Sequence, residues 1–183
     1  MTLTESEISL YDRCEKGDQR AQMHLYDRYS KAMFNVAVRI LKDDAVAEDA
    51  MQESMITAFT KMHQWNREAT FGAWLKRIVI NNSLTKLRQQ KKLQVVSYDA
   101  QELPLEEIVD ESIDLENAGM SVTKVLSYFS QLKDSYREIL TLFFIEGMDH
   151  EEISEITGMS YGMCRTTLSR AKDSLRKKIQ ANG

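Results

Sequence analysis

The chain has 183 residues and a formal net charge of −4, with 43% hydrophobic residues, seven glycines and one proline. This composition predicts an all-α fold, and with no long apolar run or apolar leader we expect a cytoplasmic chain without a membrane span or signal peptide. The distant Cys14 and Cys164 predict reduced thiols, and three scattered histidines predict no metal site. The sequence shows no nucleophile–base pair, phosphate loop or cofactor motif, so we expect neither an enzyme nor a cofactor or small-molecule substrate.

Charge is distributed unevenly along the chain. Residues 99–118 carry eight acidic and no basic residues, and the single proline, Pro104, lies among them. Shifts in composition of this kind mark linkers between domains. We therefore predict two small helical domains, 1–97 and 119–183, joined by an acidic linker at 98–118.

Two helices are expected early in the first domain. Residues 22–41 place apolar side chains at helical spacing, which predicts a core helix. Asp43 and Asp44 are N-cap candidates for a helix at Ala45–Met62.

One side of this second helix is acidic, and a single apolar residue interrupts it. Its apolar and small residues share one arc, and an opposite narrow stripe carries acidic and amide groups together with one isoleucine. A solvated acidic face is one interpretation. The other is a docking surface for a basic partner, since an apolar residue ringed by carboxylates is typical of interfaces. The stripe consists of Asp49, Gln52, Glu53 and Ile56.

A polar loop at His63–Ala69 precedes a basic helix. The helix is expected from Thr70, its cap, to Lys92, with Trp74 and other apolar residues facing a core. Arginine and asparagine on one line of a helix, beside a loop that carries Trp65, suit backbone phosphates and an unstacked base. That line consists of Arg77, Asn81, Leu84 and Arg88.

The segment His150–Ile179 predicts two helices joined by a short turn. Gly158 can adopt the left-handed conformation that ends a helix, and Ser160 is placed to cap the next one. The periodicity of the second helix predicts a packed stripe formed by Tyr161, Cys164, Leu168, Ala171, Leu175 and Ile179. Its other side carries Arg165, Thr166, Ser169, Arg170, Arg176 and Lys177. A helix anchored on one stripe with such groups on the other can enter a DNA major groove.

Three stretches in this order resemble bacterial sigma factors of the extracytoplasmic-function group, which have regions two and four only. The stretches are AEDAMQESMITAF, then FGAWLKRIVINNSLTKLR with its preceding loop, then the sequence from LKDSYREILTLFF to the last helix. The resemblance implies a transcription initiation factor that binds core RNA polymerase and promoter DNA. It also implies an anti-sigma factor as a partner and a linker that threads toward the polymerase active site.

The resemblance assigns roles to individual residues. Contacts with the clamp helices of the largest polymerase subunit fall to Asp49, Gln52, Glu53 and Ile56, and the second domain meets the beta flap. Capture of the melted minus-ten strand falls to Trp65, Asn66, Arg67, Lys76, Arg77, Asn81 and Arg88. Recognition of the minus-thirty-five duplex falls to Ser160, Tyr161, Arg165, Thr166, Ser169 and Arg170. The recognition helix departs from the family at Met163, where threonine is common.

Two other classes of function compete with this interpretation. A helix-turn-helix regulator would bind its operator tightly without polymerase, usually as a symmetric dimer. An interaction adaptor would use its charged faces on proteins and show no salt-dependent DNA affinity.

Overall fold

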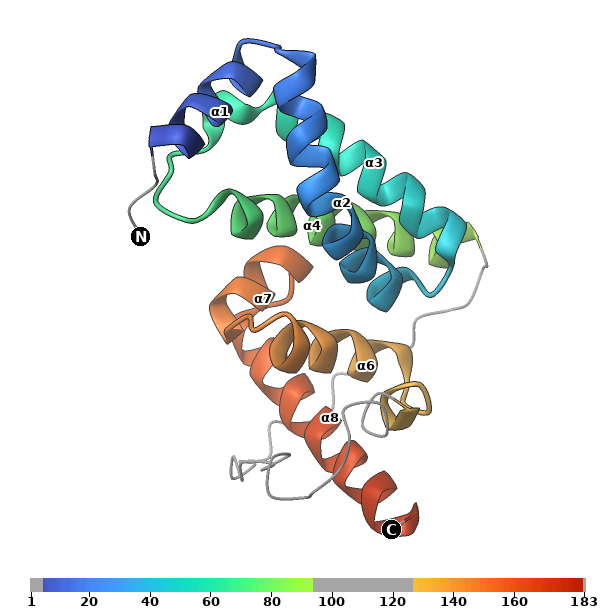
Figure 1. Cartoon of the computed structure of the whole chain (residues 1–183). Helices are drawn as coiled ribbons and strands as arrows, with labels where there is room; N and C mark the ends of the chain where they lie inside the picture. Colours follow the sequence, from blue (N-terminus) through green and yellow to red (C-terminus); the bar gives the residue numbers. More distant parts are fainter. Residues whose placement is uncertain (1–4, 94–126, 183) are drawn as a thin grey trace. The chain divides into compact units, whose positions relative to one another are not determined.

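Figure 1 shows the computed structural model, which describes residues 5–93 and 127–182. The described residues form helices and turns without a strand, so the predicted all-α fold is confirmed. They belong to two compact units, Met1–Ser97 (the first unit) and Tyr98–Gly183 (the second unit). The predicted acidic linker lies outside the described residues, and the domain boundaries stay a prediction. No helix in the described part is long and apolar enough to cross a bilayer.

The first unit is a bundle in which α2, α3 and α4 pack on one another and α1 lies against one end (Figure 1). The helix α1, which the sequence analysis did not predict, buries Tyr11 and Cys14. The elements are α1 (Glu5–Glu15), α2 (Gln19–Leu41), α3 (Asp44–Thr60), the 3-10 turn η1 (Met62–Gln64) and α4 (Phe71–Leu93). Of these, α2, α3 and α4 match the predicted helices to within a few residues.

Local capping explains where these helices begin. The Asp43 carboxylate accepts a hydrogen bond from the backbone N–H of Val46 at 3.0 Å, and the Thr70 hydroxyl accepts one from Ala73 at 3.2 Å. Both predicted caps are confirmed, although Asp44 is the first residue of α3 rather than its cap. Such bonds satisfy donors that the first helical turn leaves without a partner.

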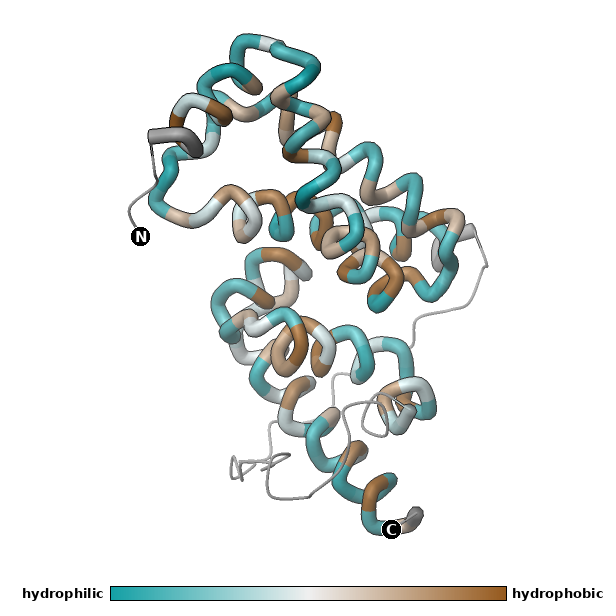
Figure 2. The backbone as a smooth tube through the Cα atoms, in the orientation of Figure 1, coloured by the Kyte–Doolittle hydropathy of each residue, from teal (hydrophilic) through white to brown (hydrophobic). Residues whose placement is uncertain are grey.

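Small side chains allow the helices of the first unit to approach closely. The buried side of α3 includes Ala47, Ala50, Ser54 and Ala58, all with no exposed surface. The distance between two helix axes depends on the side chains at their contact, so these small residues allow α3 to lie close to its neighbours. Apolar positions gather where the helices face one another, as Figure 2 shows by colour. Gly72 on α4 is required because a Cβ there would lie 2.9 Å from a ring carbon of Tyr29.

The second unit places α6 and α7 against a long last helix. The elements are α6 (Asp134–Leu140), the π-helical turn η2 (Thr141–Ile145), α7 (His150–Thr157) and α8 (Tyr161–Asn182). A capping box begins α7, with Asp149 accepting from the Glu152 backbone at 2.8 Å and Glu152 accepting from that of Asp149 at 3.1 Å. Gly158 ends α7 at φ 73°, the left-handed conformation that the sequence predicted.

The packed stripe predicted for α8 is largely confirmed. Cys164, Leu168, Ala171 and Leu175 are at most 1% exposed. Tyr161 is 51% exposed, so its place on the packed stripe was wrong. It is the first residue of the helix, where the neighbouring helix covers only one side, and its ring centroid lies 6.0 Å from that of His150.

Candidate nucleic-acid interface and docking surface

The start of α8 presents a polar surface. The Ser160 hydroxyl accepts a hydrogen bond from the Met163 backbone at 3.2 Å, which confirms the predicted cap. Tyr161, Met163 and Arg165 are exposed in the first turns. Thr166, Ser169 and Arg170 are half-buried beside them, and the Thr166 hydroxyl donates to the Gly162 carbonyl at 2.8 Å. The six residues predicted to contact duplex DNA are therefore the cap Ser160 and five residues in the first three turns of α8.

The remaining basic residues of α8 are less available than their number suggests. Lys172 is only 8% exposed, and its ammonium lies 5.0 Å from the centroid of the Phe143 ring. Arg176 forms an ion pair with Asp173 at 2.9 Å. Lys172 thus stabilises the packing of α8 on η2, and Arg165 is the arginine best exposed near the helix start.

The stripe predicted on α3 is exposed as expected. Asp49, Gln52 and Glu53 face solvent, and Ile56 is 65% exposed among them. Within the described residues, the Asp49 carboxylate has no side-chain partner, whereas Gln52 donates to Glu48 at 3.2 Å. We call Asp49, Gln52, Glu53 and Ile56 the α3 stripe. An apolar side chain surrounded by polar groups fits a protein docking surface.

Glu53 is already held by α4. The Lys86 ammonium lies 2.9 Å from one of its carboxylate oxygens, and the Asn82 amide donates to the other at 3.3 Å. The hydrogen bond from Lys86, and then that from Asn82, lowers the pKa of Glu53 below its usual value. Asn82 also donates to the Ala50 carbonyl at 3.1 Å. Glu53 therefore links α3 to α4 and also lies on the docking stripe.

The exposed side of α4 differs by one residue from the predicted line. Leu84 is 1% exposed and belongs to the core, so its place on that line was wrong. Four exposed residues lie within about 80° of arc on an ideal helix. They are Arg77, Asn81, Thr85 and Arg88. We call these four the α4 stripe. Lys76 is half-buried beside it.

Trp65 does not offer its ring to a base. The side chain is 5% exposed, and its ring centroid lies 4.8 Å from that of Tyr11 and 5.5 Å from that of Phe71. The indole N–H donates to the Ala69 carbonyl at 2.9 Å. The prediction that Trp65 stacks on an unstacked base was wrong, because α1 and the start of α4 enclose the ring.

The rest of the loop is also fixed by contacts. Arg67 adopts φ 63° and forms an ion pair with Asp12 of α1, with its guanidinium 5.8 Å from the centroid of the Trp65 ring. The Asn66 amide donates to the Glu68 carboxylate at 2.6 Å. Left-handed backbone is unfavourable for arginine, so these contacts hold a conformation that the free chain would rarely adopt. Asn66 and Arg67 remain exposed at the surface of this closed loop.

Comparisons with known proteins identify the family of the chain. The family model for Sigma-70 region 2 matches residues 25–93, and that for Sigma-70, region 4 matches residues 123–175. The two matches cover most of the chain in the order that the sequence predicted. The chain is a sigma factor of the extracytoplasmic-function group.

Curated relatives match this sigma factor over nearly its whole length. The ECF RNA polymerase sigma factor SigW of Bacillus subtilis is 27% identical, with 91% of this chain and 92% of the relative covered. The RNA polymerase sigma-H factor of Pseudomonas aeruginosa is 27% identical, with 98% and 97% covered. The ECF RNA polymerase sigma-E factor of Haemophilus influenzae is 26% identical, with 94% of each covered.

Solved structures share the fold of this sigma factor. CnrH in complex with the cytosolic domain of CnrY has a TM-score of 0.55 and 21% identity, covering 95% of this chain and 97% of that one. RpoE in complex with the anti-sigma factor NepR from Bartonella quintana has a TM-score of 0.56 and 18% identity, covering 88% and 98%. At these identities the likeness concerns the fold.

Membership of this family fixes the coarse function. The sigma factor is a transcription initiation factor that binds core RNA polymerase and promoter DNA, and it is not an enzyme. The match of the first unit to region 2 has no place in an operator-binding regulator, so that alternative is not favoured.

Two further residues belong to these surfaces and were not predicted from the sequence. Thr85 completes the α4 stripe, and its hydroxyl donates to the Asn81 carbonyl at 2.8 Å. Lys86 holds Glu53. Helical spacing of four from Arg77 and Asn81 could have found Thr85, whereas no local signal links Lys86 to α3.

Proposed function

We propose that this sigma factor recognises promoter DNA with the start of α8 and the α4 stripe, and binds core polymerase with the α3 stripe. The start of α8 enters the major groove of the minus-thirty-five element, with Ser160 and Tyr161 at its edge. Arg165, Thr166, Ser169 and Arg170 face the bases and phosphates. The observation that supports this is an exposed polar surface on a helix held by a buried stripe on its other side.

The α3 stripe docks on the clamp helices of the largest polymerase subunit. Ile56 supplies the apolar contact, since its exposed side chain loses water only when a partner covers it. Asp49 and Gln52 supply polar contacts at the rim. Glu53 serves both the docking surface and the bond to α4, so a change there affects docking and fold together.

The α4 stripe, with Lys76 and the exposed loop residues Asn66 and Arg67, holds the opened minus-ten strand. Unstacking a base costs a few kcal/mol, which contacts to the separated strand must offset. Because Trp65 is buried, we infer that hydrogen bonds and phosphate contacts supply this free energy. The groups that can make them are the guanidinium groups of Arg77 and Arg88, the amide of Asn81 and the hydroxyl of Thr85.

Two further assignments accompany this mechanism. We infer that the sigma factor acts in the cytoplasm, where core polymerase and DNA are found, and that its second unit meets the beta flap. An anti-sigma factor is the inferred regulator, because two proteins of the same fold were solved with such partners or with a cytosolic domain bound. That partner would compete with polymerase for the chain.

The recognition role is tested at Arg165, the exposed arginine at the start of α8. Arg165→Ala should reduce discrimination at one upstream base pair by about 1–3 kcal/mol, the value of a bidentate contact to a base. The measurement is holoenzyme binding to promoter duplexes with each base pair changed in turn. Lys177→Ala, an exposed basic position far along the same helix, is the matched control. If Arg165→Ala changes the affinity for every duplex by the same amount, and so alters discrimination no more than Lys177→Ala does, the contact between Arg165 and a base is refuted.

The docking role is tested at Asp49, which takes no part in the hydrogen bonds between α3 and α4. Asp49→Lys should weaken binding to core polymerase at least tenfold while leaving the unfolding midpoint of the first unit unchanged. Asp27→Lys makes the same charge reversal on an exposed position of α2. Equal affinity of the two variants for polymerase would show that the α3 stripe is not the docking surface.

A further inference from the structure

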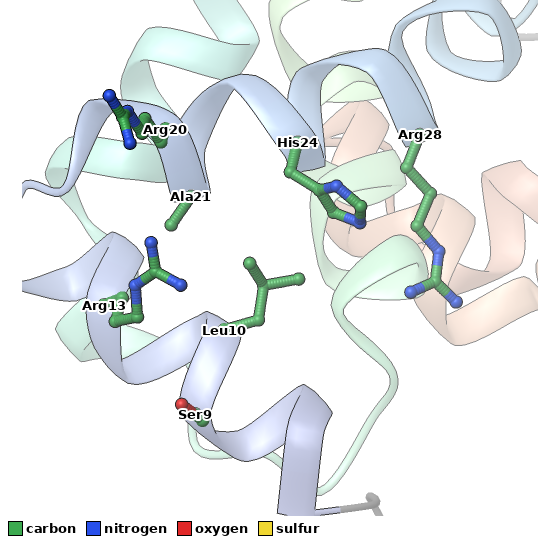
Figure 3. A pocket seen from close by; sticks show the side chains of 7 residues that line it. All are labelled: Ser9, Leu10, Arg13, Arg20, Ala21, His24 and Arg28. Atoms are coloured by element: carbon green, nitrogen blue, oxygen red, sulfur yellow. The ribbon is translucent and has the colours of Figure 1, made fainter.

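A groove between α1 and α2 has basic walls that none of the three proposed surfaces uses. Its cavity volume is about 430 Å³. Figure 3 shows its lining, in which Leu10 and Ala21 occupy the middle and basic side chains surround them. The lining residues are Ser9, Leu10, Arg13, Arg20, Ala21, His24 and Arg28. No acidic residue lines it among those that the structure describes.

Basic residues follow a regular spacing along α2. Arg20, His24 and Arg28 are four residues apart, so a rise of 1.5 Å per residue places them about 6 Å from one another along the helix axis. All three are exposed. Arg13 approaches from α1, and its guanidinium is oriented by Asp18, with Nη2 and Oδ2 2.7 Å apart. The hydrogen bond from Arg13 lowers the pKa of Asp18 and keeps this support ionised.

Two of the basic side chains of the groove, Arg20 and His24, contribute little to the fold. The core contacts of α1 come from Tyr11 and Cys14, which are at most 3% exposed. Within the described residues, the side chains of Arg20 and His24 make no hydrogen bond or ion pair with a protein group. Arg20 and His24 are therefore available to a ligand from outside the chain.

The chemistry of the groove favours phosphate over a protein surface. Guanidinium groups form paired hydrogen bonds with phosphate oxygens, and the His24 imidazole has an N–H donor. A protein interface needs a sizeable apolar centre, but Ala21 is 2% exposed and only Leu10 adds partly exposed apolar surface. The repeated spacing on α2 matches a ligand that carries charges at regular intervals.

We propose that this groove binds the phosphodiester backbone of a single DNA strand in the initiating complex. The proposal rests on the proposed function, because it requires promoter DNA beside the first unit. It adds a sequence-independent contact outside the α4 stripe, with Arg20 and Arg28 on phosphates and Arg13 at the opposite wall.

Salt dependence tests the proposal, because each phosphate that a cation neutralises on a single strand adds about 0.7 to the slope of log K against log salt. The probe is a fluorescent single-stranded DNA oligonucleotide of mixed sequence, titrated with holoenzyme made from the full chain and core polymerase. Arg20→Gln with Arg28→Gln should lower the slope by about 1.4, and Arg20→Gln alone by about 0.7. Lys61→Gln removes the same charge at an exposed position outside the groove and should leave the slope unchanged.

An unchanged slope for the folded double variant would overturn the proposal. If the double variant also binds core polymerase more weakly in the absence of DNA while the slope is unchanged, the groove is a protein docking surface and the proposal is overturned. Its failure can be told apart from failure of the proposed function. Loss of the groove alone leaves the effect of Arg165→Ala on base discrimination intact, whereas a chain that never redirects polymerase refutes both.

Discussion

Burial of Trp65 predicts that this residue stabilises the first unit instead of stacking on DNA. Its ring packs against Tyr11, Phe71 and Trp74, with centroids 4.8, 5.5 and 6.3 Å away, and its N–H reaches the Ala69 carbonyl at 2.9 Å. Replacing a buried tryptophan by alanine costs about 3–5 kcal/mol. Trp65→Phe keeps most of the aromatic packing and loses the hydrogen bond, worth about 0.5–1.5 kcal/mol.

Tryptophan fluorescence is a suitable assay for this change. The chain has two tryptophans, and both lie in the first unit, so Trp74 still reports its unfolding in Trp65→Ala. With an m value of about 1–3 kcal/mol per molar urea, a loss of about 3–5 kcal/mol lowers the midpoint by at least about 1 M. Gln64→Ala, at an exposed neighbouring position, should stay within about 0.5 kcal/mol of the original chain.

A different result is expected if Trp65 binds DNA instead of stabilising the first unit. If Trp65 stacked on a base, Trp65→Ala would leave the urea midpoint unchanged and weaken capture of the opened strand by about 1–3 kcal/mol. Strand binding is therefore measured on the same preparations, at a temperature where each variant is folded.

Two further predictions concern a buried thiol and a helix cap. Burial raises the pKa of the Cys14 thiol to about 11 from a usual 9.0, so at pH 8 its thiolate fraction is about a hundredfold lower than usual. The native chain should react slowly with a thiol reagent until urea unfolds it, and fast native reaction would contradict this. Since the pKa is raised on folding, the associated stability is complete below about pH 9 and is lost as pH rises through about 11. Asp149→Ala removes the bond that the Glu152 N–H donates to the Asp149 carboxylate, whereas the backbone N–H at position 149 can still donate to the Glu152 carboxylate. The loss should destabilise α7 by about 0.5–2 kcal/mol, seen as faster amide exchange at Glu152, and Glu151→Ala should have less effect. Unchanged exchange would show that the box does not stabilise the helix.

The parts of the fold that the sequence predicted depend on local signals. The caps at Asp43, Thr70 and Ser160 and the left-handed Gly158 are each decided within a few residues. The capping box at Asp149 has an equally clear signature, an acid followed three residues later by a glutamate, and could have been predicted.

The errors arose where contacts between distant segments decide the structure. The polar start of the chain forms α1 because Tyr11 packs on Trp65 and Phe71, which lie more than 50 residues away. Trp65, in a polar loop, is buried by that same helix. Leu84 was placed on an exposed line because α4 packs on more than one side, and periodicity then defines its exposed stripe poorly.

In vitro mapping of transcription start sites shows whether the chain directs core RNA polymerase to new promoters. Core RNA polymerase, with and without the purified chain, transcribes a library of genomic fragments, and the first nucleotides of the transcripts are sequenced. We expect new start sites that require the chain and share upstream elements near minus ten and minus thirty-five. A chain that fails to join the polymerase, or joins it without changing where transcripts begin, would contradict the account.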